Sequence, residues 1–156
     1  MSAVEFKNLS ICDLIIDRVY EGGNNNNVSD DPITKILPVG NMGGFRFNGP
    51  ITKPNLIVLY TDGQDLDWPD NLNPELGIFE YYGDNRSPGK LKTETKRKGN
   101  LILEYLFESL HNCDSPRDYI PPIFIFEKHP TSKSSRSVIF RGLCVPGSKT
   151  HSQTED

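Results

Sequence analysis

Hydrophobic and polar positions along the chain predict several short strands rather than a helical bundle. Residues 56–60 (LIVLY) form an unbroken apolar run, which is typical of a strand buried on both faces. Residues 14–20, 78–82, 123–127 and 138–145 are rich in β-branched and aromatic side chains and end near turn-forming residues, so strands are expected there too. Twelve prolines and 13 glycines, spread along the chain, supply the turns between such short elements.

Two further segments carry local signals. Residues 41–49 (NMGGFRFNG) are bracketed by glycines, and strand alternation places Phe45 and Phe47 on one side with Arg46 on the other. An aspartate followed by proline at 31–32 is typical of a helix start, which predicts one short helical turn over residues 32–37.

One longer helix is expected after Asn100, which we interpret as its N-cap. Leu103, Leu106, Phe107 and Leu110 follow at i, i+3, i+4 and i+7, so they form a single apolar stripe that can pack on a sheet. Five or six strands and this helix predict a mixed α+β domain, built as a curled sheet or an open β-barrel with one main helix.

The length of 156 residues and the 35% hydrophobic content suit a single domain with one core. We expect that domain to span residues 1–147, and we interpret the polar residues 148–156 as the start of a linker to a further domain. No apolar run is long enough to cross a bilayer, and the first residues lack a secretion signal, so a cytoplasmic location is expected.

Cysteine and histidine give no sign of a metal site. Cys12, Cys113 and Cys144 have no metal-ligand spacing, and the three histidines are scattered, so we expect reduced, mostly buried thiols, no metal and no organic cofactor.

Charge is distributed unevenly, although the net charge is −4. Between residues 86 and 98 six cationic side chains face a single acid, Glu94, whereas acids gather at residues 62–70. One face of an acidic molecule could therefore be basic enough to meet a DNA backbone.

The acidic loop and the strand end at Tyr81-Tyr82 have the groups that an extruded DNA base requires. A flipped base must be restacked on aromatic rings, and the exocyclic amino group of cytosine needs an acceptor such as a carboxylate. Aspartates at 62, 65, 67 and 70 and the single Trp68 lie between two predicted strands, and the second of these ends in Tyr81-Tyr82-Gly83. If the two strands pair, these groups would meet at one end of the sheet.

This order of residues resembles the core of SRA domains, in which a strand of the type S-I-V-L with G-G-Y-x-D-D is followed by a strand ending in Y-T-G. The chain is more similar still to the N-terminal domain of AspBHI-type enzymes in the MspJI group of modification-dependent endonucleases. That similarity runs from about residue 14 to 147. Its residues are Val19-Tyr20-Glu21-Gly22-Gly23, Gly43-Gly44-Phe45-Arg46, Trp68-Pro69-Asp70, Tyr82-Gly83-Asp84-Asn85-Arg86, Lys98-Gly99-Asn100, Pro121-Pro122-Ile123-Phe124 and Gly142-Leu143-Cys144-Val145-Pro146-Gly147.

The resemblance implies an SRA-like fold and a pocket for a flipped 5-methylcytosine or 5-hydroxymethylcytosine in double-stranded DNA. It places Tyr81 as a stacking ring with Tyr82 beside it. It also implies that Asp67 or Asp70 faces the base amino group, and Asp70 is favoured because Trp68-Pro69-Asp70 is the rigid part of the loop. Gln64 stands near the place of the first SRA tyrosine, so Trp68 could supply the other stacking plane.

The expected function is a DNA-binding module that targets a fused endonuclease and has no nuclease activity of its own. The residues expected to contact DNA are Arg46, Asn85, Arg86, Lys90, Lys92, Lys96, Arg97 and Lys98.

Three alternatives stay open at the level of sequence. Trp68 could be an ordinary core residue, and Arg46 a surface charge between two core phenylalanines. Pro69-Asp70 with Glu94-Thr95-Lys96 formally fits the PD-(D/E)xK pattern of metal-dependent nucleases. The third alternative is a protein-interaction module without a DNA role.

Overall fold

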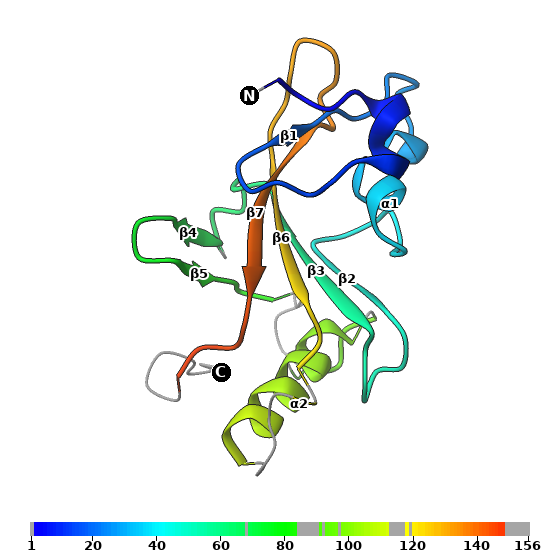
Figure 1. Ribbon diagram of the computed structural model, residues 1–156. Helices are drawn as coiled ribbons and strands as arrows, with labels where there is room; N and C mark the ends of the chain where they lie inside the picture. The colour runs from blue at the N-terminus through cyan, green and yellow to red at the C-terminus, as the bar shows by residue number, and fades with distance from the viewer. Residues whose placement is uncertain are drawn as a thin grey trace.

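The structure is a computed structural model that describes residues 2–67, 69–83, 91, 93–96, 98–112, 118 and 120–148. The elements (Figure 1) are, in chain order, η1 (Phe6–Ile11), β1 (Val19–Tyr20), η2 (Val28–Asp30), α1 (Ile33–Ile36), β2 (Phe45–Asn48), β3 (Leu56–Thr61), β4 (Asn71–Asn73), β5 (Ile78–Glu80), α2 (Gly99–Asn112), β6 (Ile123–Lys128) and β7 (Val138–Cys144).

Five strands form one curled sheet in the order β1-β7-β6-β3-β2, and β4 and β5 form a separate hairpin. β3 and β6 pair in parallel at the centre, whereas the other neighbours in the sheet are antiparallel. A parallel pair cannot be joined by a tight turn. The chain therefore leaves the sheet after β3 and returns at β6, and this crossover carries the hairpin and α2.

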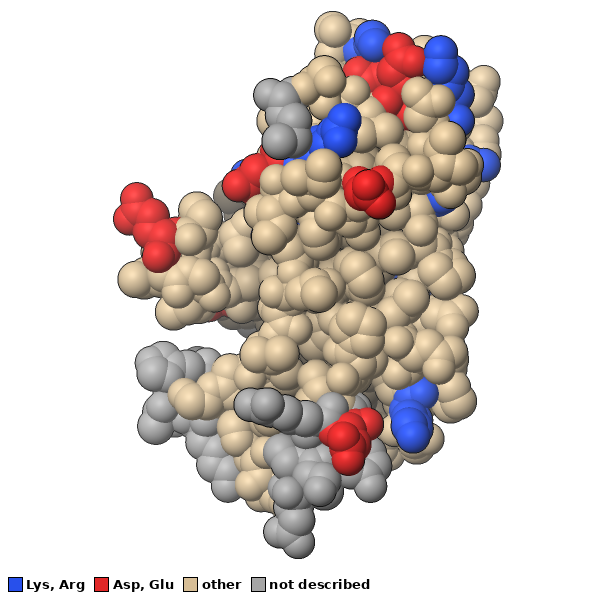
Figure 2. Space-filling view, in the orientation of Figure 1, with Lys and Arg blue, Asp and Glu red and all other residues tan. Residues whose placement is uncertain are grey.

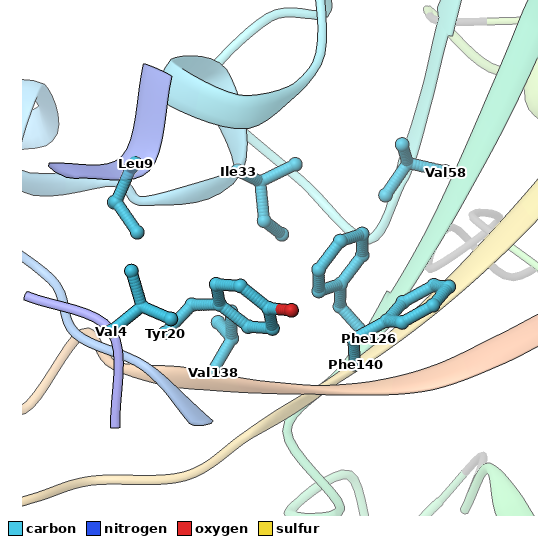
Figure 3. Packing of buried hydrophobic residues seen from close by; sticks show 8 residues of the cluster. All are labelled: Val4, Leu9, Tyr20, Ile33, Val58, Phe126, Val138 and Phe140. Atoms are coloured by element: carbon cyan, nitrogen blue, oxygen red, sulfur yellow. The ribbon is translucent and has the colours of Figure 1, made fainter. Parts of the chain in front are cut away.

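One face of the sheet is covered by the N-terminal segment, η1 and α1. Figure 3 shows the cluster on that face, in which Tyr20, Phe126 and Phe140 are packed with smaller apolar side chains. The rings of Phe126 and Phe140 are 5.2 Å apart between centroids and tilted by 45°, a favourable aromatic geometry. The cluster consists of Val4, Leu9, Tyr20, Ile33, Val58, Phe126, Val138 and Phe140.

The opposite face is covered by α2. Ile102 and Leu106 of the helix pack against Phe45, Ile57 and Ile123 of the sheet. Both helix residues are buried, with exposed fractions of 0% and 3%. The expected stripe of Leu103, Leu106, Phe107 and Leu110 is thus rotated, because Ile102 rather than Phe107 lies at its centre.

The central strand confirms its sequence prediction. Val58 belongs to the first cluster, and Ile57 and Leu59 belong to the second, so β3 is buried on both faces. β6 and β7 also lie close to their expected positions, and the α+β architecture with a curled, open sheet and one main helix is confirmed.

Three local predictions need correction. The strand expected at 14–20 is only Val19–Tyr20, because Asp17 has a left-handed backbone with φ +61° and interrupts the extended chain. The acidic loop expected between the predicted strands at 56–60 and 78–82 is followed by β4. Consequently the strand expected at 78–82 is the shorter Ile78–Glu80, and it pairs with β4 instead of with β3.

The helix α2 begins at Gly99, so Asn100 is not its N-cap. Lys98 precedes the helix with φ +58°, and its carbonyl accepts a hydrogen bond from the Ile102 N–H at 3.0 Å. The helical turn expected at 32–37 is α1, whose N-cap is Pro32 rather than Asp31. The Asp31 side chain, one residue earlier, accepts a hydrogen bond from the Ile33 N–H at 2.8 Å.

Arg46 is a buried structural residue, which corrects its assignment as a DNA contact. Its guanidinium pairs with the Asp31 carboxylate, and the two side chains are 6% and 7% exposed. It also donates to the carbonyl oxygens of Gly43 at 2.9 Å and Gly40 at 3.1 Å, and lies 5.5 Å from the centre of the Tyr60 ring. Arg46 thereby fastens the 40–44 segment to the start of α1.

Two of the three cysteines lie in the described part of the chain, and both are free and half-buried. Burial raises the pKa of the Cys144 thiol to about 11, so this thiol is protonated and unreactive at neutral pH. Cys113 lies outside the described residues. Within the described helices, none is both long and apolar enough to span a bilayer.

The first core cluster yields a stability prediction. Phe126→Ala removes a fully buried ring and should lower the free energy of unfolding by about 3–5 kcal/mol. Leu143→Ala, at a side chain that is 62% exposed, should change it by about 0.5 kcal/mol or less. Urea unfolding followed by tryptophan fluorescence measures both values, and equal losses in the two variants would contradict this core assignment.

The buried ion pair yields a second prediction. Arg46→Met leaves the Asp31 carboxylate buried without its cation, so the free energy of unfolding should fall by about 3–5 kcal/mol. The matched control is Arg136→Met at an exposed arginine, which should alter stability by about 0.5 kcal/mol or less. Thermal unfolding tests the difference; an Arg46 variant as stable as the control would show that the ion pair is dispensable.

Candidate functional site

The candidate site begins where β3 ends. Thr61 is the last residue of that strand and is 6% exposed. Its side-chain oxygen accepts a hydrogen bond from the Gly63 N–H at 3.3 Å. The carboxylates of Asp62 and Asp65 then accept from the backbone N–H groups two residues further on, at 3.1 and 3.2 Å. These successive side-chain turns give the acidic loop a defined course.

Asp70 lies beside this strand end and is half-buried. Its Oδ1 accepts a hydrogen bond from the Tyr82 backbone N–H at 3.1 Å. Burial raises the Asp70 pKa, hydrogen bonding to the Tyr82 backbone and to the Thr61 side chain opposes that rise, and the nearby charges of Asp62 and Asp65 add to it. A carboxylate in this setting is costly to ionise and is fixed in orientation, which is typical of functional sites.

The two tyrosines after β5 point into different surroundings, as alternation along an extended chain predicts. Tyr81 is half-buried and packs against the second core cluster, with its ring 5.9 Å from that of Phe79. Tyr82 is 54% exposed. The Asp70 carboxyl group is therefore bonded to the backbone of a segment in which one ring is anchored in the core and the next is exposed.

Glycines allow close approaches on both sides of this tyrosine pair. A Cβ on Gly44 would lie 2.8 Å from the Tyr60 carbonyl oxygen and 3.4 Å from the Tyr81 hydroxyl. Gly83 has φ +85°, and a Cβ there would lie 2.3 Å from the Asn100 side-chain oxygen. Larger residues would displace the tyrosine segment, so these two glycines help to determine where Tyr81 and Tyr82 lie.

A shallow hollow, open to solvent and about 350 Å³ in volume, borders the acidic loop. It is lined by Asp62, Gln64, Asp65 and Leu66. Acidic side chains also lie on the projecting β4–β5 turn, which contains the exposed Glu75 (Figure 2). The Lys and Arg side chains of this face gather largely at the end formed by the N-terminal segment. The negative turn is unsuited to contact with phosphates.

The residues predicted for the pocket are only partly brought together. Asp70, Tyr81 and Tyr82 meet at the end of β3, whereas Asp67 is exposed and its N–H is bonded to Asp65. Trp68 lies outside the described residues.

Among the predicted DNA contacts, Lys96 is exposed and Lys98 is half-buried. Arg46 is removed from this group by its burial. Asn85, Arg86, Lys90, Lys92 and Arg97 lie outside the described residues.

The nuclease pattern does not form a converging site in the described part of the chain. Glu94 and Lys96 are exposed and belong to no strand, whereas a metal-dependent nuclease needs its acids and lysine on adjoining elements around the metal. No group of three or more His, Cys, Asp or Glu residues that could hold a metal occurs among the described residues.

The sequence alone did not predict Thr61 or Gly44 as residues of the site. Thr61 ends an apolar strand and reads as one more β-branched strand residue, and Gly44 reads as part of a turn. Their proximity to Asp70 and Tyr81 depends on contacts between segments distant in sequence.

The comparisons with known proteins concern the family and the fold of the chain. The family model described as "Restriction endonuclease AspBHI N-terminal" matches residues 14–156. A search of curated proteins gives no match.

Two solved structures resemble the chain over almost its full length. One is described as the DNA recognition domain of the cytosine modification-dependent restriction endonuclease LpnPI. It has a TM-score of 0.92 and 52% identity, and the match covers 100% of this chain and 69% of that one. The other is the DNA modification-dependent restriction endonuclease AspBHI, with a TM-score of 0.86, 38% identity, and coverage of 99% and 70%. On this evidence, the chain belongs to the family of AspBHI-type restriction endonuclease N-terminal domains.

Proposed function

We propose that this chain is a DNA-binding module that recognises 5-methylcytosine or 5-hydroxymethylcytosine in duplex DNA and directs a fused endonuclease to it. Membership of the AspBHI-type family supports the proposal, as do the two similar structures, which are named for DNA recognition or modification-dependent cleavage. The observation that carries it is Asp70, a half-buried carboxyl group held by the Tyr82 backbone N–H near the end of the central strand.

The proposed recognition requires the modified cytosine to leave the duplex, since its Watson–Crick edge is otherwise paired. The Asp70 carboxylate is suited to accept a hydrogen bond from the cytosine N4 amino group, which is a donor. The Tyr82 N–H holds Asp70 in place, and a carboxylate has about four acceptor positions, so it can still accept from a base.

Tyr81 is the proposed stacking ring. Its contacts with Phe79 and the second core cluster hold it in one place, so little side-chain freedom is lost when a base stacks on it. Tyr82, with its exposed ring, suits contact with the DNA surface. Trp68 stays a sequence-based candidate for the second stacking plane.

The carbon-5 substituent is the proposed basis of selectivity. A methyl-sized hollow contributes about 1–3 kcal/mol, so the preference over unmodified cytosine should be real but moderate. Lys96 and Lys98, with the cationic residues predicted around them, would supply contacts to phosphates that position the domain without reading sequence.

The role of Asp70 is tested by Asp70→Asn. The amide can still accept from the Tyr82 N–H but loses the carboxylate charge, so affinity for a 5-methylcytosine duplex should fall by about 1.5–3 kcal/mol, roughly 10- to 100-fold. The matched control is Asp67→Asn at an exposed aspartate. Competition binding at fixed salt, with duplexes that differ only at one cytosine, measures the effect; loss in the Asp67 variant alone would transfer the role to Asp67.

Stability should respond to Asp70→Asn differently from binding. Because the folded-state pKa of Asp70 is raised, its contribution to stability is present at low pH and is lost as pH rises through that pKa. At neutral pH the asparagine variant should therefore unfold at the same denaturant concentration as the wild type or a higher one. A large fall in its midpoint would mean that Asp70 is retained for folding rather than for recognition.

The stacking assignment is tested by Tyr81→Leu and Tyr82→Leu. Leucine at 81 keeps apolar bulk against Phe79 but removes the ring face, so affinity for the modified duplex should drop by about 1–3 kcal/mol. The Tyr82 variant should weaken binding to modified and unmodified duplexes alike. If only Tyr82→Leu abolishes the preference for the modified duplex, Tyr82 is the stacking residue.

A further inference from the structure

The helix α2 supports the segment that carries the two tyrosines. Tyr81 packs against the second core cluster, to which α2 contributes Ile102 and Leu106. Asn100 is the second residue of the same helix, and its side chain is half-buried. The first turn of α2 therefore offers a polar side chain, and the next turns an apolar surface, to neighbouring parts of the chain.

The Asn100 side chain lies directly against the backbone of Gly83. A Cβ on Gly83 would be 2.3 Å from Oδ1 of Asn100, 3.0 Å from its Cγ and 3.2 Å from its Nδ2. All three heavy atoms of the carboxamide group are thus too close to admit any side chain at position 83. Gly83 also has φ +85°, a conformation that glycine adopts readily. The carboxamide of Asn100 therefore limits where the chain can run immediately after Tyr82.

This contact is adjacent in the chain to the groups proposed to read the base. The Tyr82 N–H donates to the Asp70 carboxylate at 3.1 Å, and the next residue is Gly83. Tyr81, the proposed stacking ring, precedes Tyr82. A shift of Gly83 would consequently move the donor that holds Asp70 and the backbone that carries the Tyr81 ring.

We propose that Asn100 is a positioning residue for base recognition: its carboxamide holds Gly83 in place, and through Gly83 the Tyr82 N–H and the Tyr81 ring, without contacting the base. This inference rests on the proposed function, in which Asp70 accepts from the flipped cytosine and Tyr81 stacks on it. It gives α2 a part in recognition in addition to its part in the core.

Two substitutions change this contact from opposite sides. Gly83→Ala adds a methyl group where the carboxamide lies, and Asn100→Ala removes the carboxamide. Gly77→Ala is the matched control for the first, because Gly77 also has a positive φ, +64°, but a Cβ there meets nothing within 4 Å. Asn112→Ala, at the exposed far end of the same helix, is the control for the second.

The experiment measures dissociation constants at fixed salt for two duplexes that differ only in cytosine or 5-methylcytosine at one position. In Gly83→Ala and in Asn100→Ala the ratio of the two constants should fall about tenfold, a coupling of the size found between residues in contact. A variant that is only less stable binds both duplexes more weakly by the same factor, so its ratio does not change. Gly77→Ala and Asn112→Ala should therefore keep the wild-type ratio.

The double variant Gly83→Ala with Asn100→Ala tests whether the two residues act through each other. The added methyl group would occupy space that the carboxamide leaves, so the double variant should show the ratio of Asn100→Ala alone. Losses that multiply would mean that the two residues act independently, and this result would overturn the inference.

The outcomes separate this inference from the function on which it rests. If Asp70→Asn and Tyr81→Leu lose the preference for 5-methylcytosine while Gly83→Ala and Asn100→Ala keep the wild-type ratio, Asn100 is not a positioning residue. If Asp70→Asn and Tyr81→Leu both keep the preference, the proposed reading site is wrong whatever Asn100 does.

A second variant at position 100 decides the question if Gly83→Ala does not fold. Asn100→Asp keeps the shape of the side chain, so it should recover most of the ratio that Asn100→Ala loses. A wild-type ratio in Asn100→Ala, or an equal loss in the alanine and aspartate variants, would contradict the proposed role of the Asn100 contact.

Discussion

The parallel pairing of β3 with β6 is the constraint on which the rest of this structure depends. The register runs from Ile57 opposite Ile123 to Thr61 opposite Glu127, and it places β3 between two hydrophobic clusters. A strand buried on both faces and bonded on both edges is among the least mobile parts of a domain. The candidate site starts at its last residue, so the acidic loop and Asp70 begin from a fixed point.

In the proposed site, stability and recognition make opposite demands on Asp70. Its burial and the neighbouring Asp62 and Asp65 disfavour the ionised form, and the two hydrogen bonds only partly offset this. Arg46 and Asp31 show the contrasting case, in which a buried carboxylate is matched by a guanidinium and serves the fold. Carboxylates that reduce stability without a cationic partner are expected where a ligand completes their hydrogen bonding.

The sequence predicted those features that depend on local patterns. The apolar run at 56–60, the alternation around Phe45 and Phe47, and the late strands all appear close to their expected positions. Prediction from the sequence failed where contacts between distant segments determine the structure. Residues 78–80 pair with β4 rather than β3, Arg46 meets Asp31 in the interior, and Ile102 rather than Phe107 faces the sheet. The proximity of Asp70 to Tyr82 could be anticipated from the family resemblance, but the burial of Thr61 at the end of β3 depends on the fold.

The crossover between β3 and β6 has a consequence for how such domains diversify. Asp70, Tyr81, the β4–β5 hairpin and α2 all belong to one uninterrupted stretch, residues 62–122, while the sheet and its N-terminal cover are encoded on either side. Because function is carried by loops that a rigid scaffold positions, one recombination event can exchange this whole stretch between related genes. The sheet and its N-terminal cover would then stay constant, while the residues proposed to read the base would be exchanged together.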